Sequence, residues 1–368
     1  MIRLAWVIDT FEAAFRAKYR DRLKPEHTRA LAAIKQCRTA LSRKMHIQCT
    51  DCDHQLLMPH SCGHRHCPHC QHHESQQWLE RQLKKQVPAE YFMLTFTLPA
   101  EFRPLARAHP RVVYELLMRA GWETVRTFTQ NDKTLHGTPG AIAVLHTNTR
   151  QLEYHPHIHL VMPAAAVDGA RKQWRTKRRA KKGGYLFNHT ALATVFRARM
   201  LAGLDAAGLS LPARHPTRWV VDCKAVGSGE KALVYLGRYL YRGVIREQDI
   251  VACTDTTVTF AYKDAKTKTT ERCTLSGADF LWRVLQHVLP KGFRRARNFG
   301  FLHPNCKRLI ALLHWLLRVV PPAPATWVKA RAPILCPCCG APMKIVQTKL
   351  RTASGKTVPP PIATALVL

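Results

Sequence analysis

The chain has 368 residues and is strongly basic, with 57 Lys and Arg against 24 Asp and Glu and a formal net charge of +33. An excess of like charge causes self-repulsion, so it indicates a polyanionic partner, with nucleic acid as the first candidate. The apolar stretches do not indicate a membrane protein. The apolar run at the start is too short for a signal peptide, and His314 and Arg318 interrupt the later stretch 308–322. We therefore expect an intracellular chain, whose 13 cysteines are metal ligands and buried thiols rather than disulfides.

The N-terminal part, residues 8–44, predicts two helices at about 11–23 and 25–43. Pro25 suits the first turn of the second helix, where its missing N–H has no intrahelical role. The composition changes after these helices, and residues 45–75 become rich in Cys and His. This change marks the start of a candidate metal-binding segment.

Four cysteines of that segment follow the pattern C-x2-C-x14-C-x2-C, namely Cys49, Cys52, Cys67 and Cys70. Each C-x2-C turn can hold one ion through two thiolates, and two such turns complete a tetrahedron. The spacing therefore predicts a closed, structural zinc site that helps to fold the module. Cys62 and His66 lie inside the loop, and either could replace a ligand or help to bind a second ion.

From residue 90 onward, strand and helix patterns alternate. The predicted strands are 91–99, 141–147, 155–163 and 218–223, and the predicted helices are 112–130, 191–204 and 229–244. This β-α-β-β-α-β order, followed by a helix, predicts an α+β fold with a ferredoxin-like antiparallel sheet, in which the third strand is central. Pro156 cannot donate to a ladder, so we expect regular pairing to begin near His157, with His155 at the rim.

The C-terminal part predicts a hairpin at 257–275 and two apolar helices, at about 279–289 and 308–320. The motif "CPCCG" at 336–340 then offers half of a second structural metal site, through Cys336 and Cys339. Another half-motif, "HPNC", could complete that site through His303 and Cys306. The stretch "KTVPPPIATALVL" at 356–368 has no period, and we expect a loose tail from residue 346 onward.

Three histidines occupy alternate positions of the third strand, His155, His157 and His159. Same-face neighbours on a strand lie roughly 6.6 Å apart, so the imidazoles of His157 and His159 can hold one cation together. The third ligand stays open among His155, His146 and Glu153. Imidazole ligands alone suggest zinc, and an incomplete ligand shell suits a Lewis acid that acts on a phosphodiester.

Two tyrosines, Tyr235 and Tyr239, stand four residues apart on the last predicted helix and share one face. Such a pair could simply be part of an amphipathic core stripe. Arg238 and Arg242 beside the phenols indicate an anionic ligand instead. Tyr241 points elsewhere.

A basic block at 171–184 follows the histidine strand. It is either a solvated insertion or a DNA contact, and its candidate DNA-binding residues are Lys172, Arg175, Arg178 and Arg179.

These motifs together resemble the two-tyrosine HUH rolling-circle transposases of bacterial insertion sequences, of the type with an N-terminal zinc-binding domain. HUH denotes His-hydrophobic-His, here His157-Ile158-His159. The match covers about residues 45–345 and includes "SCGHRHCPHCQ", "VLHTNTRQLEYHPHIHLV", "YLGRYLYR" and "HVLPKGFRRARNFGFLHPN" in the order of the family.

The resemblance implies that Tyr235 and Tyr239 are paired nucleophiles that nick and rejoin single-stranded DNA at element ends through a 5′-phosphotyrosine. It also implies Mg²⁺ or Mn²⁺ at the histidines, in place of the zinc that imidazoles suggest. The expected partners are single-stranded transposon ends and target DNA, with a host helicase for unwinding, since the chain has no G-x-x-x-x-G-K-[ST] loop. A bacterial, cytoplasmic and nucleoid-associated location would follow.

The motifs and patterns divide the chain into four expected parts. They are a helical and zinc-binding module at 1–88 that binds DNA, an HUH catalytic domain at 89–275, a helical region with the half-motifs at 276–345 and a loose tail at 346–368. Other readings are a plasmid replication initiator or relaxase with the same chemistry, a non-enzymatic zinc-finger DNA-binding protein and a zinc hydrolase. No general base accompanies the His pair in the sequence, which disfavours the hydrolase.

Overall fold

The computed structural model describes residues 1–350 except 71, 179–185, 241–242, 265 and 321–332. The chain forms two compact units, one of residues 1–35 and 64–328 and the other of residues 36–63 and 329–368. This division differs from the four consecutive parts that the sequence predicts. The N-terminal helices belong to the same unit as the main sheet, and the smaller unit combines two distant parts of the chain.

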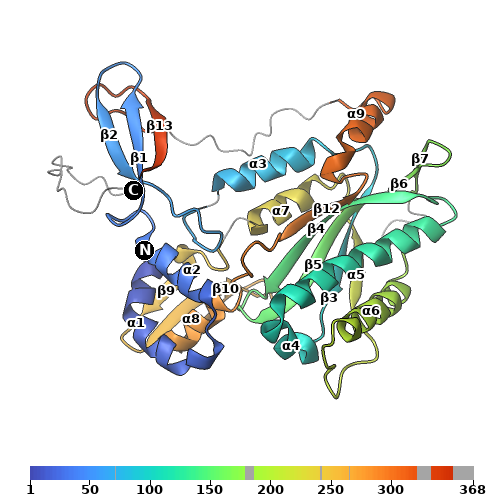
Figure 1. The fold of residues 1–368 in the computed structure, drawn as a ribbon, viewed down its shortest axis with the longest axis horizontal. Coiled ribbons are helices and arrows are strands. Elements are labelled where there is room, and N and C mark those ends of the chain that lie inside the picture. The colour runs from blue at the N-terminus through green and yellow to red at the C-terminus, as the bar shows by residue number, and fades with distance from the viewer. Residues whose placement is uncertain (71, 179–185, 241–242, 265, 321–332, 351–368) are drawn as a thin grey trace. The chain divides into compact units, whose positions relative to one another are not determined.

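The larger unit is built on a sheet that has seven strands among the described residues (Figure 1). Six of them follow the order β7-β6-β4-β5-β3-β8, and β12 also pairs with β4; all these pairs are antiparallel. The strands are β3 Tyr91–Thr97, β4 Thr138–Asn148, β5 Tyr154–Pro163, β6 Ala165–Asp168, β7 Gln173–Thr176, β8 Val221–Ala225 and β12 Ala296–Gly300.

The four strands of the predicted unit lie in the order β4-β5-β3-β8. Numbered along the unit, this is 2-3-1-4, the order of a ferredoxin-like sheet, so the predicted α+β class is confirmed. The histidine strand β5 lies between β4 and β3, as predicted. Helices cover both faces of the sheet (Figure 1): α5 Pro110–Asn131 and α6 His189–Ala206 on one, and α3 His72–Leu83 and α7 Glu230–Leu240 on the other.

The alternation of side chains along β4 and β5 assigns each residue to one of the two faces. Ile158 and Leu160 of β5 belong to the core under α5 and α6, whereas Val161 belongs to the core under α7. The odd-numbered histidines of β5 therefore face α7. On β4, Val144 lies in the α7 core, so the even-numbered positions of this strand face the same way.

Pro156 coincides with an irregularity in the ladder, as expected for a residue without an N–H. Pairing of β5 with β3 begins at His157, opposite Thr97. Against β4 the register shifts between the pairs His146–His157 and Asn148–Tyr154, which is a β-bulge. The prediction that regular pairing starts near His157 is confirmed.

The larger unit also contains α1 Leu4–Lys18, α2 Pro25–Gln36, α4 Arg103–Ala108, β9 Ile250–Cys253, β10 Thr257–Lys263, β11 Thr270–Ser276, α8 Gly277–Leu285 and α9 Lys307–Leu316. Of these, β9, β10 and β11 form a separate sheet of the order β11-β10-β9. The first helix starts at residue 4 and the second ends at residue 36, so both differ from the predicted bounds. None of the helices described here has both the length and the apolar character of a membrane span.

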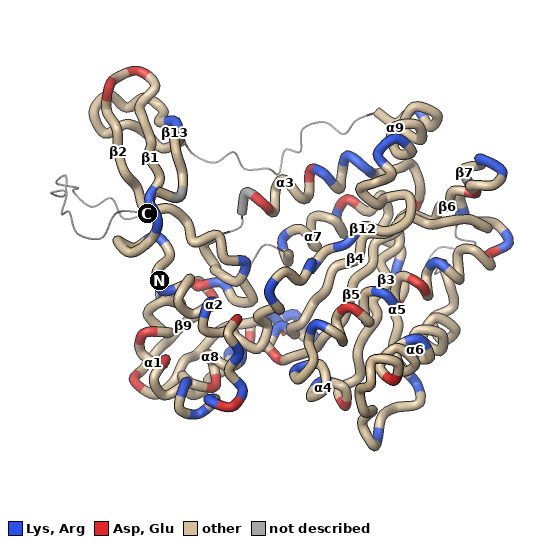
Figure 2. Tube along the Cα trace, in the orientation of Figure 1, with Lys and Arg blue, Asp and Glu red and all other residues tan. Residues whose placement is uncertain are grey.

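Positive charge is spread widely over the larger unit. Figure 2 shows Lys and Arg on most of its helices and on several strands and loops, with fewer Asp and Glu. The excess is therefore not confined to the basic block 171–184.

The smaller unit is a three-stranded sheet of the order β13-β1-β2, made of β1 Lys44–Cys49, β2 Gln55–Pro59 and β13 Met343–Leu350. Residues 346–350 are thus part of a strand, and their prediction as loose tail is wrong. These residues pair with β1, which lies far away in the sequence. The rest of the predicted tail, 351–368, lies outside the described residues.

Gly300 provides a test of the packing at β12. Its φ is +57°, and a Cβ at this position would lie 1.7 Å from the backbone oxygen of Pro139. The Gly300→Ala substitution should therefore combine left-handed strain with overpacking against backbone and lower the free energy of unfolding by about 3 kcal/mol or more.

The control is Gly292→Ala, since Gly292 has a φ of +77° but no atom within 4 Å of the added Cβ. It should cost only about 1–2 kcal/mol. Thermal or urea unfolding of both variants measures the difference, and equal losses would contradict the close approach of β12 to Pro139.

Candidate active site and cysteine clusters

Three histidines converge on the face of the sheet that α7 covers. His146 on β4 pairs directly with His157 on β5, and His159 lies one same-face step further along β5. Ring nitrogens of His146, His157 and His159 lie within 4.8 Å of one another. The predicted pair is thus brought together, and His146 is the third member of the cluster.

The other two candidates for the third position are engaged elsewhere. The guanidinium of Arg103 donates a hydrogen bond to Nδ1 of His155 at 2.8 Å. The carboxylate of Glu153 lies 3.7 Å from the guanidinium of Arg283. The ring of His155 lies next to that of His157, but it is not part of the three-residue cluster.

The hydrogen bonds of the cluster leave ring nitrogens for a cation. Nδ1 of His157 donates to the carbonyl oxygen of His155 at 2.7 Å, so its Nε2 has a free lone pair. Nδ1 of His159 lies 2.9 Å from the hydroxyl of Thr95, which can hold the same tautomer. Nε2 of His146 is buried without a hydrogen-bond partner among the described residues. A bound cation would satisfy that atom, and such support of the far ring nitrogen is typical of metal-binding histidines.

Burial keeps these imidazoles neutral. Burial lowers the pKa of His159 to about 4, and burial together with the neighbouring His159 lowers the pKa of His157 to about 3. Complete burial also lowers the pKa of His146 well below its ordinary value. Because only neutral imidazole binds a metal, the cluster is ready for a cation at neutral pH.

The helix α7 places both tyrosines over the histidines. Its apolar residues Leu233, Leu236 and Leu240 are buried in the core with α3 and the sheet. Tyr235 and Tyr239 lie on the histidine side: the ring of Tyr239 stacks on that of His146, with centroids 3.3 Å apart. The ring of Tyr235 lies 6.0 Å from that of His146 and 6.1 Å from that of His159.

The two phenols differ in their surroundings. The hydroxyl of Tyr239 donates to Oδ1 of Asn148 and accepts a hydrogen bond from the backbone N–H of Thr147 at 3.2 Å. Tyr235 is 50% exposed. Partial burial, and secondarily the neighbouring Tyr239, raises the pKa of the Tyr235 phenol. Tyr241 and Arg242 lie outside the described residues.

Arg295 is a residue of this site that the sequence analysis did not single out. Its guanidinium lies 4.3 Å from the centre of the Tyr239 ring and donates to the carbonyl oxygens of Leu145 and Leu240 at 3.1 and 3.4 Å. Only 9% of its surface is exposed. The stretch "KGFRRARN" contains several arginines, and no local pattern distinguishes the one that is buried.

A cavity of about 950 Å³ opens beside the histidines and tyrosines. It is lined by His146, His157, both tyrosines, the β4–β5 turn and β10. Its basic lining residues are Arg150, Arg238, Arg246, Lys263 and Arg295, and its acidic ones are Glu153, Asp249 and Asp264, of which Asp249 pairs with Arg246. The basic residues outnumber the acidic ones, so the cavity can hold an anionic ligand next to the phenols.

Of the predicted DNA-binding residues, Arg238 lies in the lining of this cavity. Among the described residues of the basic block, Lys172, Arg175 and Arg178 are not part of the lining. They lie on or beside β7 at the edge of the sheet, where Arg175 pairs with Asp168. Arg179, like Arg242, lies outside the described residues.

Comparisons with known proteins identify the family of the chain. A family described as "Putative transposase" matches residues 140–309, and a "Transposase zinc-binding domain" matches residues 7–98. The chain is 33% identical over 346 residues to "Putative transposase y4qJ" of Sinorhizobium fredii, over 88% of this chain and 86% of that protein. The chain belongs to the IS91-type family of insertion-sequence transposases.

A second relative is the transposase for insertion sequence element IS801 of Pseudomonas savastanoi pv. phaseolicola. It is 29% identical over 333 residues, which are 83% of this chain and 80% of that protein. No solved structure matches the chain. All three histidines of the cluster, both tyrosines and Arg295 lie inside the transposase match at 140–309.

The cysteines of this transposase group differently from the prediction. Cys49 and Cys52 do not lie with Cys67 and Cys70. Their sulfurs cluster with those of Cys336 and Cys339, within 4.8 Å of one another. Spacing along the chain shows which cysteines form a chelating pair, but not which second pair completes a site.

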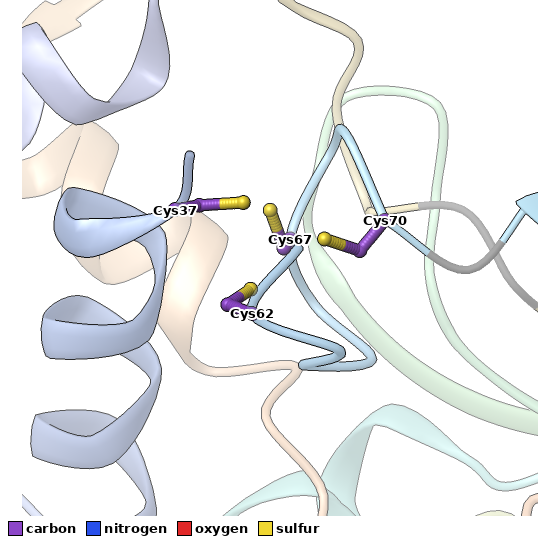
Figure 3. Close-up of side chains that lie close together, drawn as sticks. All are labelled: Cys37, Cys62, Cys67 and Cys70. Atoms are coloured by element: carbon purple, nitrogen blue, oxygen red, sulfur yellow. The ribbon is translucent and has the colours of Figure 1, made fainter. Parts of the chain in front are cut away.

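Cys67 and Cys70 lie with Cys37 and Cys62, again with sulfurs within 4.8 Å of one another. Figure 3 shows the four side chains pointing toward a common centre. Cys62 thus joins a cluster, whereas Nε2 of the buried His66 accepts a hydrogen bond from the backbone N–H of Leu289. All four cysteines lie inside the zinc-binding match, and together they support a structural zinc ion in this transposase.

The prediction that His303 and Cys306 complete a metal site with Cys336 and Cys339 is wrong. Nδ1 of His303 accepts from the backbone N–H of Asn305, and the thiol of Cys306 lies against the carbonyl of Gly300. Neither lies in the cluster that contains Cys336 and Cys339. His303 and Cys306 instead lie around the turn between β12 and α9.

The low pKa values of the histidines predict an unusual pH dependence of metal binding. At imidazoles of ordinary pKa, near 6.5, the neutral fraction falls about tenfold per ring between pH 7.5 and 5.5. With a pKa of about 3 for His157 and about 4 for His159, the Kd for Mn²⁺ should change less than about twofold over that range. Calorimetric titration with Mn²⁺ at both pH values measures this.

The matched variants are His159→Ala and His155→Ala, both on β5. The first removes a ring of the cluster and should weaken Mn²⁺ binding at least about tenfold, since even supporting residues have effects of this size. The second removes a ring that is hydrogen-bonded to Arg103 and should leave the Kd for Mn²⁺ nearly unchanged. A similar loss in both variants would contradict the three-histidine cluster.

Proposed function

We propose that this transposase nicks and rejoins single-stranded DNA at the ends of its insertion sequence, with Tyr235 and Tyr239 as nucleophiles. The observation that carries the proposal is the convergence of two phenols and three neutral imidazoles beside a basic cavity. A DNA-binding protein without catalysis would not need two tyrosines placed beside a cation-ready cluster. The names of the relatives favour a transposase over a replication initiator with the same chemistry.

The reaction is a transesterification. A tyrosine oxygen attacks the scissile phosphorus, the new O–P bond replaces the bond to the 3′ oxygen, and the strand is left with a 5′-phosphotyrosine and a free 3′-OH. The phenol gives up its proton and the leaving oxygen gains one. Because the phosphodiester bond energy is kept, rejoining by a 3′-OH needs no nucleotide cofactor.

The histidine cluster would hold the divalent ion. His146, His157 and His159 leave positions for phosphate and water oxygens, which suit Mg²⁺ or Mn²⁺. Bound there, the ion would polarise the scissile phosphate and orient it for attack. Arg238 and Arg150 line the same cavity and would bind neighbouring backbone phosphates. The partners are single-stranded element ends and target DNA in the bacterial cytoplasm, with unwinding by a host helicase.

The different surroundings of the phenols support an order of attack. Tyr235 is half exposed at the cavity and can meet a strand directly. The hydroxyl of Tyr239 is held by Asn148 and Thr147, and its ring lies between His146 and Arg295. Tyr235 thus makes the first attack, and Tyr239 acts on the second strand once its hydroxyl leaves Asn148.

The first experiment mixes the protein, Mn²⁺ and a labelled single-stranded element end, and measures label that stays on the protein in boiling detergent. Tyr235→Phe should lower the adduct at least about 100-fold, because the attacking oxygen is absent. Tyr239→Phe should keep the first adduct and lose strand transfer. His157→Ala should lose the adduct and keep most of the DNA binding.

The control is Tyr262→Phe. Tyr262 lines the same cavity, but its hydroxyl accepts a hydrogen bond from the side chain of Gln151. This variant should keep adduct formation and transfer. An adduct in the double variant Tyr235→Phe/Tyr239→Phe would refute the assignment of the nucleophiles.

Asn148 tests the order of attack. Asn148→Ala removes the acceptor that holds the Tyr239 hydroxyl. The share of adduct on Tyr239, mapped by mass spectrometry of the DNA-linked peptide, should then rise several-fold above that of the wild type. If the wild-type adduct already lies mainly on Tyr239, the proposed order is reversed.

A further inference from the structure

We propose that the smaller unit is a zinc ribbon and contains a second zinc site, in which Cys49, Cys52, Cys336 and Cys339 hold one ion. The match to a transposase zinc-binding domain ends at residue 98, so it does not include Cys336 and Cys339. In this assignment, the metal fastens the C-terminal strand β13 to β1 and β2.

The sulfur positions fit one tetrahedral ion. Sγ of Cys339 lies 3.4 Å from that of Cys49 and 3.6 Å from that of Cys52, and the sulfurs of Cys52 and Cys336 are 3.7 Å apart. Four sulfurs at about 2.3 Å from zinc have edges of about 3.8 Å. The same separations are far longer than a disulfide bond of about 2.05 Å.

Two turns present the sulfurs in the way that zinc sites require. The N–H of Cys49 donates to the carbonyl of His54, and the N–H of Asp51 points at the Cys49 sulfur at 3.4 Å. In the other turn, the N–H of Cys336 donates to the carbonyl of Ala341 and that of Gly340 to the carbonyl of Cys336. Each C-x2-C pair is thus held at a closed turn, and an N–H directed at a sulfur favours the thiolate form that binds metal.

The unit has a small apolar core. Its buried cluster consists of Ile47, Cys49, Cys336 and Met343, two of which are proposed ligands, and the other apolar side chains packed against it, such as Leu56 and Met58, are only partly buried. Leu57 and Ile345, on β2 and β13, are more than half exposed. Small three-stranded sheets need an apolar face, a metal or a disulfide to be stable, and the cysteines here are not bonded to one another.

The site also joins distant parts of the chain. Cys52 and Cys336 are 284 residues apart. Closing so long a separation costs conformational entropy, and a bound metal ion offsets this cost because its binding free energy contributes to folding. The ion would therefore be required for β13 to pair with β1.

Cys338 provides a matched control within the same turn. It lies between two proposed ligands, but it is exposed and its sulfur contacts Nδ1 of His54 at 3.3 Å. It is not a member of the four-sulfur cluster. Replacing Cys338 tests whether any cysteine of the turn affects metal content, or only the two ligands.

The experiment measures zinc in the purified full-length protein by mass spectrometry of the metal. Cys336→Ser and Cys49→Ser should each contain one zinc ion fewer per chain than the wild type. The zinc content of Cys338→Ser should equal that of the wild type. Unchanged zinc in Cys336→Ser, or the same loss in Cys338→Ser, would overturn the assignment.

A second measurement covers the case in which a variant folds poorly. Alkylation of the zinc-loaded wild type with iodoacetamide, read by peptide mass spectrometry, should spare the four ligands and modify Cys338. A chelator should expose all four together, and Cys336→Ser should expose Cys49 and Cys52. If Cys49 and Cys52 stay protected in that variant, the two halves do not share an ion. Neither measurement involves DNA, so the result is independent of the proposed tyrosine chemistry.

Discussion

The pairing register between β4 and β5 is the constraint on which the candidate site depends. Because side chains alternate along a strand, one residue of slip would move every histidine of β5 into the apolar core under α5 and α6. The register is fixed by that core, in which Ile158 and Leu160 are fully buried. The apolar residues between the histidines thus hold the imidazoles on the other face.

The same register brings in His146. It faces His157 across the ladder, two positions from Val144, which belongs to the core under α7. The helix α7 packs on this face through the leucines of its buried side. Its two tyrosines therefore lie next to the histidines, at the same end of the strands. One packing arrangement therefore brings together side chains from three separate elements.

Local patterns in the sequence predicted much of this arrangement. The strand and helix order gave the ferredoxin-like sheet, and alternation along β5 placed His157 and His159 together, because both depend on short-range periodicity. The choice of His146 over His155 and Glu153 could not be made, since it depends on the register of β4 past the bulge at Pro156. Arg295 was missed for a related reason: its burial follows from tertiary packing, and its neighbours in the chain are equally basic.

The cysteines show the same limit in another form. The C-x2-C spacing identifies a chelating pair reliably, but four pairs or half-pairs can be combined in several ways. Cys49 and Cys52 were assigned to Cys67 and Cys70, whereas their neighbours in space are Cys336 and Cys339. Residues 346–350 of β13 were assigned to the tail because their partner strand β1 lies about 300 residues earlier, beyond the reach of any local signal.

The electrostatics of the candidate active site favour a phosphate. The cluster consists of three imidazoles that burial keeps neutral, so they would not offset the charge of a divalent cation. The buried guanidinium of Arg295 lies one phenol ring away, and its described hydrogen bonds go to carbonyl oxygens rather than to carboxylates. Positive charge held in a partly buried site is costly until an anion enters. A backbone phosphate at the phenols would provide that anion. Because the histidine cluster contains no carboxylate that would neutralise this positive charge, the site favours the state in which a phosphate is bound over the empty state.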